Sequence, residues 1–351
     1  MISITEKTLK DLEFHTILQT ISDRCNTEIG MEKALQIQPF KNKETLFSEL
    51  AYTNEYVSSF TNNNALPNHG FETVTSDLKL LAIEDSFLEL AAIKKILDLS
   101  KSTNEYLKFL KKFKEYYPEL FQKSAEIEFT PFITKSIEEI VNKYGEIKDD
   151  ASPDLVNIRR SINVVRGKIN QSFGMALSHF NSLGYLDDIK ETVVDNRRVL
   201  AVQAMYRKKV KGSILGNSKT GSIAYIEPET TLKYSRELNN LEFEEREEIM
   251  RILRVLSATI RPYVNLIAQY QDFLSDIDLI AAKAKYANRI NGILPKINDE
   301  KRLFFREAFH PILLLNNKAE NKPTFPQTIE LESNNRIIVI SGPNAGGKTI
   351  S

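Results

Sequence analysis

The residues best suited to chemistry stand at the end of the sequence, where a short apolar run leads into a glycine-rich segment. Residues 336–340 (Arg-Ile-Ile-Val-Ile) predict a strand, and residues 342–349 then follow the pattern G-x-x-x-x-G-K-T. Between a strand and a helix, that pattern is typical of the phosphate-binding P-loop. The alternative is a plain glycine-rich turn that ends in lysine, but the preceding strand favours nucleotide binding.

Each part of the predicted loop has a physical role. Glycines let backbone N–H groups converge on phosphate oxygens, and the helix that follows offers its positive N-terminus to the same anion. Lys348 adds a point charge, and the Thr349 hydroxyl is expected to bind Mg²⁺. The expected nucleotide-binding residues are Gly342, Pro343, Asn344, Ala345, Gly346, Gly347, Lys348 and Thr349.

A P-loop ATPase also needs an acidic Mg²⁺ ligand and a residue that positions the attacking water, both normally on later strands. The sequence ends at Ser351, before any such strand. We therefore expect residues 1–351 alone to position phosphate without turning over ATP.

The composition suits a soluble, helix-rich protein with more than one compact unit. The 351 residues include 47 Lys and Arg and 47 Asp and Glu, so nucleic-acid binding would need a local basic patch. Cys25 is the only cysteine, which excludes an intramolecular disulfide and a cysteine zinc cluster and predicts a core residue. No apolar run is long enough for a membrane helix, and the cytoplasm is the expected location.

Amphipathic periodicity predicts helices through much of the first 150 residues. Apolar residues repeat at helical spacing in two helices within residues 5–37, and again over residues 46–60, 87–100 and 102–117. Apolar stripes of this kind are typical of core-facing helices. We expect this region to form a helical body without a catalytic group of residues.

Two longer helices are predicted further along the chain. The first begins at Ser152, an N-cap candidate followed by Pro153, and continues to about residue 183, whereas the second covers about residues 229–263. A narrow apolar seam at steps of three and four runs along the first helix: Leu155, Ile158, Ile162, Val165, Ile169 and Phe173. Such a seam in polar helices predicts an antiparallel pair that packs as a coiled coil.

Residues 192–227, between the two long helices, have a strand-like pattern instead. Apolar runs at residues 199–202 and 223–226 are separated by a turn-rich segment at residues 216–221, which predicts a small β module at the end of the helical pair. The cations of this module are Arg197, Arg198, Arg207, Lys208, Lys209, Lys211 and Lys219. They fit a solvated hairpin surface, but their place at the end of a long arm favours contact with nucleic-acid phosphates.

Three segments carry a resemblance to a known family. Residues 342–349 (G-P-N-A-G-G-K-T) resemble the Walker A loop of the MutS family of DNA repair ATPases. Residues 7–14 (K-T-L-K-D-L-E-F) are similar to the start of its bacterial MutS-two subfamily, and residues 210–214 and 218–228 resemble the clamp region of that subfamily. His310-Pro311 resembles the R-H-P before the family's ATPase sheet, with Phe309 in place of the Arg. The resemblance extends over essentially the whole chain.

The resemblance implies a mainly α fold: a helical core with long coiled-coil lever helices, a small β clamp insert and the truncated start of an α/β P-loop ATPase domain. The implied segments are 1–150 for the helical core, 151–191 for the outgoing lever helix, 192–228 for the β-rich clamp, 229–275 for the returning lever helix, 276–304 for the return of the helical core and 305–351 for the start of the ATPase domain.

The resemblance also implies an activity and partners. It predicts a homodimer that uses ATP and Mg²⁺ to gate a clamp on branched or duplex DNA, held through the backbone independently of sequence, in recombination control or repair. A ribosome or structured RNA is an alternative target. In the family an apolar or aromatic residue packs against adenine, and Phe325 stands in about the right place, although a plain core role fits Phe325 equally well.

Two other functional classes remain open from the sequence. One is a P-loop phosphotransferase with a helical N-terminal extension, which would place substrate and lid residues after the P-loop. A MutS-type protein would place an acidic magnesium motif there instead. The other is a coiled-coil scaffold with an inert P-loop, which nucleotide binding by the complete protein would oppose.

Overall fold

The computed structural model describes residues 4–62 and 64–339, and the chain separates into two compact units. Of the described residues, 4–62, 64–78, 95–131 and 263–339 belong to the first unit, and 79–94 and 132–262 belong to the second. Most of the described chain is helical, and its strands form two small antiparallel sheets. The prediction of a mainly α fold with a small β insert is therefore confirmed. The predicted P-loop at residues 342–349 lies outside the described residues. The strand predicted before it, at residues 336–340, is not found in residues 336–339, which the structure describes.

In the first unit, several helices pack against a long helix, α11 (Val264–Arg289), and half of the residues of α11 are buried. The others are α1 (Glu6–Asp11), α2 (Phe14–Ser22), α3 (Glu28–Leu35), α4 (Lys43–Ser58), α7 (Pro118–Ser124) and α12 (Pro311–Ala319). Cys25 is buried in a cluster with Ile21, Ala34, Ala282 and Tyr286, as expected for a core cysteine. Helices α5 (Thr75–Leu81) and α6 (Leu90–Lys112) have residues in both units.

Two helix boundaries differ from the sequence prediction. Residues 5–37 form three helices rather than two, because Glu13 adopts a left-handed conformation with φ of 51° and separates α1 from α2. The helices predicted at 87–100 and 102–117 are joined in α6. Ser100, Thr103 and Asn104 are buried at this junction, and the Thr103 hydroxyl donates to the Leu99 carbonyl at 2.9 Å, so it bonds within the helix instead of ending it.

A buried carboxylate ties the start of α3 to α11. Asp278 of α11 has no exposed surface and accepts hydrogen bonds from the backbone N–H groups of Asn26 and Thr27 at 2.9 Å each and from the Thr27 hydroxyl at 2.7 Å. The His69 ring Nε2 lies 3.1 Å from the same carboxylate. Gly30 allows this approach, because a Cβ there would lie 2.3 Å from Asp278 Oδ2.

The last described elements of the first unit are β5 (Leu303–Ala308) and β6 (Gln327–Leu331), which pair antiparallel. Between them, His310 is the N-cap of α12, and its ring Nδ1 accepts from the Leu313 N–H at 3.4 Å. The segment His310-Pro311 therefore forms a helix start in this chain.

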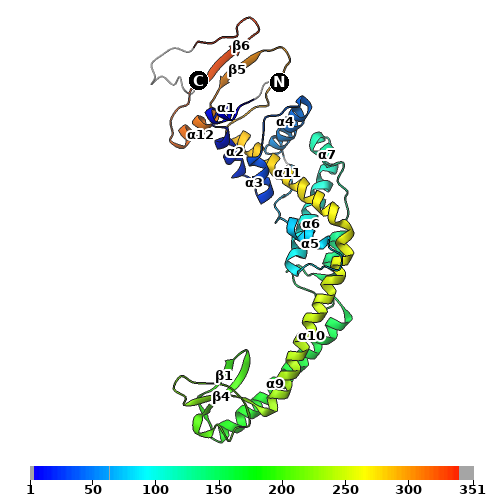
Figure 1. Cartoon of the computed structure of the whole chain (residues 1–351), viewed down its shortest axis with the longest axis vertical. Coiled ribbons are helices and arrows are strands. Elements are labelled where there is room, and N and C mark those ends of the chain that lie inside the picture. Colours follow the sequence, from blue (N-terminus) through cyan, green and yellow to red (C-terminus); the bar gives the residue numbers. More distant parts are fainter. Residues whose placement is uncertain (1–3, 63, 340–351) are drawn as a thin grey trace. The chain divides into compact units, whose positions relative to one another are not determined.

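The second unit is built on two long helices, α9 (Pro153–Ser182) and α10 (Glu229–Ile260), preceded by α8 (Phe132–Ile140). Helices α9 and α10 lie side by side and lead into a small sheet (Figure 1). Four residues of the predicted seam, Leu155, Ile162, Val165 and Phe173, are buried. The 3-10 turn η2 (Arg261–Tyr263) follows α10. No described helix is long and apolar enough to cross a membrane.

Polar contacts fix the register of the two long helices, which run antiparallel. Ser152 Oγ donates to buried Glu248 at 2.5 Å while it caps α9 by accepting from the Leu155 N–H. Further along, Arg159 pairs with Glu245 at 2.7 Å, Arg166 pairs with Glu242 at 3.3 Å and Ser172 lies 3.4 Å from Thr231. The residue numbers of the contacting residues decrease along α10 as they increase along α9, so all four contacts agree with one antiparallel alignment.

The sheet has four strands in the order β1-β2-β4-β3, and neighbouring strands are antiparallel. They are β1 (Leu186–Val194), β2 (Arg197–Gln203), β3 (Gly212–Asn217) and β4 (Ile223–Pro228), with the 3-10 turn η1 (Ala204–Tyr206) after β2. Asp195 and Asn196 link β1 to β2 with φ angles of 48° and 60°, as a tight two-residue hairpin requires. The sheet starts earlier than the expected residue 192: α9 ends at Ser182, and β1 is an edge strand whose exposed charges hide the strand pattern.

Candidate nucleic-acid interface

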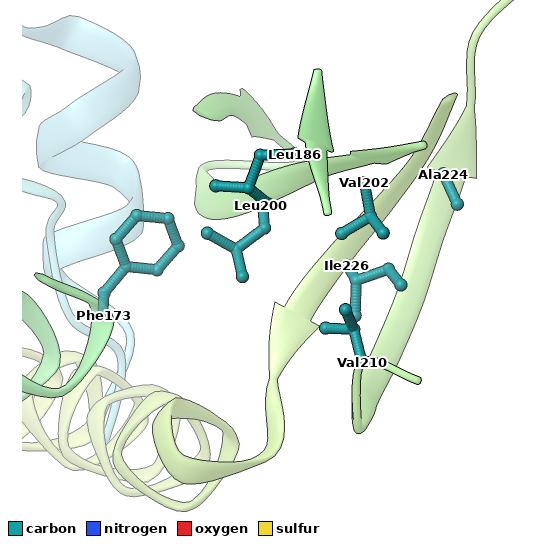
Figure 2. Close-up of a cluster of buried hydrophobic side chains, with 7 residues drawn as sticks. All are labelled: Phe173, Leu186, Leu200, Val202, Val210, Ala224 and Ile226. Carbon is teal, nitrogen blue, oxygen red and sulfur yellow. The ribbon is translucent and has the colours of Figure 1, made fainter. Parts of the chain in front are cut away.

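The sheet is fixed to the end of α9 by an apolar core. Figure 2 shows the Phe173 ring of α9 pointing toward Leu186 of β1 and Leu200 of β2. The other buried members of this core are Val202, Val210, Ala224 and Ile226. Val210 belongs to the connection between β2 and β3, so its burial holds that connection against the sheet. The polar residues around it are thereby presented from a rigid base.

Two of the seven predicted phosphate-binding cations are engaged within the protein. Arg197 pairs with the buried carboxylate of Glu227 at 3.2 Å. Arg198 forms hydrogen bonds to Glu191 at 2.6 and 3.1 Å, and its guanidinium lies 4.4 Å from the centre of the Phe173 ring. These contacts make the two arginines structural parts of the sheet and its junction with α9.

The other five cations are exposed: Arg207, Lys208, Lys209, Lys211 and Lys219. Within the part of the chain that the structure describes, none of them forms an ion pair with a carboxylate. Their charges are therefore available to an anionic partner.

Strand register divides these five cations between the two ends of the sheet. Gln203 pairs with Ile223 at one end, whereas Gly212 pairs with Pro228 at the other. The connection after β2 and the β3–β4 loop meet at the first end, where the Ala204 N–H donates to the Ser222 carbonyl at 2.9 Å. We name residues 204–209 and 218–222 the basic tip. It contains Arg207, Lys208, Lys209 and Lys219, and Lys211 lies at the opposite end.

Two aromatic rings support the basic tip. Tyr185 and Tyr206 stack with ring centres 4.6 Å apart and planes inclined by 19°. The Lys209 ammonium lies 5.5 Å from the centre of each ring. Both tyrosines also pack against the apolar core of the sheet. Lys209 thus serves partly in packing, whereas Arg207, Lys208 and Lys219 have no ring contact of this kind with any residue that the structure describes.

Some features of this surface were missed from the sequence. Glu191 and Glu227 neutralise arginines that are 7 and 30 residues away along the chain, and only strand register reveals these pairs. The Tyr185–Tyr206 stack likewise joins residues on either side of two strands. Glu227 directly follows the apolar run at residues 223–226. An acid in that position was the available signal that a buried carboxylate pairs with one of the arginines.

The predicted nucleotide site is described only at its margin. Residues 342–349 lie outside the described residues, and Phe325, the candidate adenine contact, is 80% exposed. Within residues 4–62 and 64–339, no three His, Cys, Asp or Glu side chains gather as metal ligands.

The chain is similar to proteins named Endonuclease MutS2. That of Leuconostoc mesenteroides is 30% identical over 356 residues, which cover 99% of this chain and 43% of the relative. That of Ligilactobacillus salivarius is 30% identical over 350 residues, with 99% and 44% covered, and that of Staphylococcus carnosus is 28% identical over 353 residues, with 99% and 44% covered. No protein-family model matches the chain.

This chain spans less than half the length of these relatives, whereas the alignments cover nearly all of the chain itself. The similarity thus includes the helical unit, the long helices and the sheet between them. It also covers the clamp region and the P-loop, the segments from which the resemblance was noted. Along nearly its whole length, the chain is therefore similar to the N-terminal part of the proteins named Endonuclease MutS2.

Proposed function

We propose that this chain is the DNA-binding part of a MutS-like ATPase, in which the basic tip holds the phosphate backbone of branched or duplex DNA independently of sequence. The observation that carries the proposal is the set of exposed cations at one end of the sheet that have no carboxylate partner among the described residues. The apolar core and the Tyr185–Tyr206 stack hold this surface in place, so little ordering entropy opposes binding.

The same proposal gives the long helices α9 and α10 a mechanical role. They act as levers between the sheet and the rest of the protein, and their polar contacts keep them in one register while they do so. ATP and Mg²⁺ bind at residues 342–349, where Lys348 and Thr349 hold phosphate and metal, and the nucleotide state of a homodimer gates the clamp. The sequence motif and the similarity to proteins named Endonuclease MutS2 support this part.

The test is the salt dependence of binding by the complete protein. Replacing Arg207, Lys208 and Lys219 together by Ala removes the tip cations for which the described residues provide neither an ion pair nor a ring contact. Each phosphate contact on duplex DNA contributes about 0.9 to the slope of log affinity against log salt, so the slope should fall by up to about 2.7. Affinity should fall with it for all duplex sequences, while the far-UV circular dichroism spectrum stays unchanged.

Two controls make the result specific. Replacing Lys10, Lys111 and Lys114 by Ala removes three exposed cations of the first unit and should leave the slope unchanged. Lys211→Ala tests the opposite end of the sheet and should change the slope by less than the tip variant does. An unchanged slope in the tip variant would refute the proposed interface, and tighter binding to a structured RNA than to any DNA would move the proposal to RNA.

The nucleotide part is tested separately. ATP should change the affinity or the lifetime of the DNA complex of the complete protein, and Lys348→Ala should abolish that response without changing binding in the absence of ATP. A Lys348→Ala variant that still responds to ATP would refute the assignment of the nucleotide site.

A further inference from the structure

The basic tip has one large apolar side chain that packing does not explain. Met205, the middle residue of the turn η1, is 75% exposed, whereas Tyr206 beside it packs against the core of the sheet. Leaving a Met in water gives no stabilisation to the fold, and a polar residue would serve equally well at such a position. A lone exposed apolar residue would be ordinary, but this one stands within a cationic turn.

The backbone that carries Met205 is held on both sides. The Ala204 N–H donates to the Ser222 carbonyl at 2.9 Å, and the Gln203 N–H donates to the Tyr185 carbonyl at 3.0 Å. On the other side, the Lys209 N–H donates to the Tyr206 carbonyl at 2.8 Å. Met205 is therefore presented at a fixed place, directly beside the exposed charges of Arg207 and Lys208.

The positive charges of Arg207 and Lys208 indicate which kind of partner the Met205 side chain fits. An apolar contact surrounded by cations suits a surface that is apolar at one point and anionic on either side of it. Nucleic acid has this character where a base has left the stack, because the face of the base is apolar and phosphates flank it. A continuous duplex buries those faces and leaves a side chain such as Met without a contact.

We propose that Met205 covers the face of an unstacked base at a bulge, gap or branch point, while Arg207 and Lys208 hold the adjoining phosphates. This inference rests on the proposed function, and it deepens that function, since backbone contacts alone carry no preference for a break in stacking. It predicts a preference for branched over continuous nucleic acid and assigns that preference to a single side chain.

The experiment compares two ligands with the complete protein: a duplex with a bulge of unpaired bases and the same duplex without it, each prepared as DNA and as RNA. Met205→Ser should reduce affinity for the bulged duplex by roughly tenfold, the size of one partly buried apolar contact, and leave affinity for the continuous duplex unchanged. Met205→Leu keeps an apolar side chain and should retain most of the preference. Met175→Ser, at a methionine of α9 that is 61% exposed, is the matched control and should change neither affinity.

The outcomes separate this inference from the proposed function. If Met205→Ser keeps the same ratio of affinities as the unchanged protein, or if the unchanged protein does not distinguish the two ligands, the role of Met205 is refuted and the backbone clamp stands. If the unchanged protein binds neither duplex, the proposed function itself fails. A preference confined to the DNA pair or to the RNA pair identifies which nucleic acid supplies the base.

Discussion

Asp278 in the first unit and Glu242 in the second are both carboxylates that join segments far apart in the sequence, but their surroundings are opposite. Asp278 is fully buried and accepts from backbone N–H groups, a hydroxyl and a His ring. Glu242 is 40% exposed and meets an Arg166 side chain that is 57% exposed. The first contact fixes backbone position in a core, whereas the second aligns two helices and is screened by water.

The largest effect is expected from Asp278→Ala. The substitution leaves the Thr27 N–H and hydroxyl buried without their acceptor and removes the partner of the Asn26 N–H, so the free energy of unfolding should fall by about 3–5 kcal/mol. Urea denaturation followed by circular dichroism measures this loss. Asp272→Ala, on the same helix at a carboxylate that is 73% exposed, is the matched control and should cost less than about 1 kcal/mol. Equal losses in the two variants would mean that burial does not set the difference.

The pH dependence of stability sharpens the same comparison. Burial by itself would raise the pKa of Asp278, but the hydrogen bonds from His69, Asn26 and Thr27 outweigh it and hold the pKa below its usual value. A depressed carboxyl pKa adds stability above the unfolded pKa of about 3.9 and loses that stability as pH falls through the folded value. The difference in unfolding free energy between the unchanged protein and Asp278→Asn should therefore be constant near neutral pH and shrink below about pH 4. A difference that grows as pH falls would contradict the assignment.

Glu248 tests whether burial or location in the chain determines how much a carboxylate contributes to the free energy of unfolding. It belongs to the long helices, as Glu242 does, but it is 8% exposed and accepts from Ser152 and Arg251. Those hydrogen bonds, chiefly the one from Arg251, lower its pKa against the opposing effect of burial. Glu248→Ala should lower the free energy of unfolding by about 1–2 kcal/mol, because it also leaves the α9 cap without its partner. Exposed Glu247→Ala is the control, and a loss as small as that of the control would show that burial gives Glu248 no advantage.

The smallest effect is expected for the pair Arg166 and Glu242. A double-mutant cycle with Arg166→Ala and Glu242→Ala should give a coupling free energy of about 0.2–1 kcal/mol, which decreases as salt is added. Thermal denaturation at two salt concentrations measures it. A coupling above about 2 kcal/mol would place this pair with Asp278 and would remove the distinction between the two regions.

Periodicity in the sequence predicted what depends on local pattern. The seam from Leu155 to Phe173 predicted α9, and the apolar runs 199–202 and 223–226 predicted two strands of the sheet. Most of strand β1 was not predicted, because it lies at the edge of the sheet, where charged residues are tolerated and the apolar alternation is lost.

The details of the candidate site depend on register, which sequence patterns do not reveal. Charge clustering grouped Arg197 and Arg198 with the exposed lysines, although Glu227 and Glu191 neutralise both arginines in the folded sheet. The division of the exposed cations between two ends of the sheet follows from the pairs Gln203–Ile223 and Gly212–Pro228. Neither fact could be derived before the strands were paired.

The first unit is formed from three separate stretches of the chain, so it cannot be completed until the last of them has been synthesised. Asp278 meets Asn26 across 252 residues of sequence, and its helix α11 is synthesised only after both long helices and the sheet between them. At about 5–20 residues per second, roughly 10 to 50 seconds separate the emergence of Asn26 from that of Asp278. During that interval the 132–262 segment of the second unit can close on itself, because α9, the sheet and α10 are consecutive. Nascent chains halted before α11 should therefore protect the sheet from proteolysis while α2 and α3 are still cleaved.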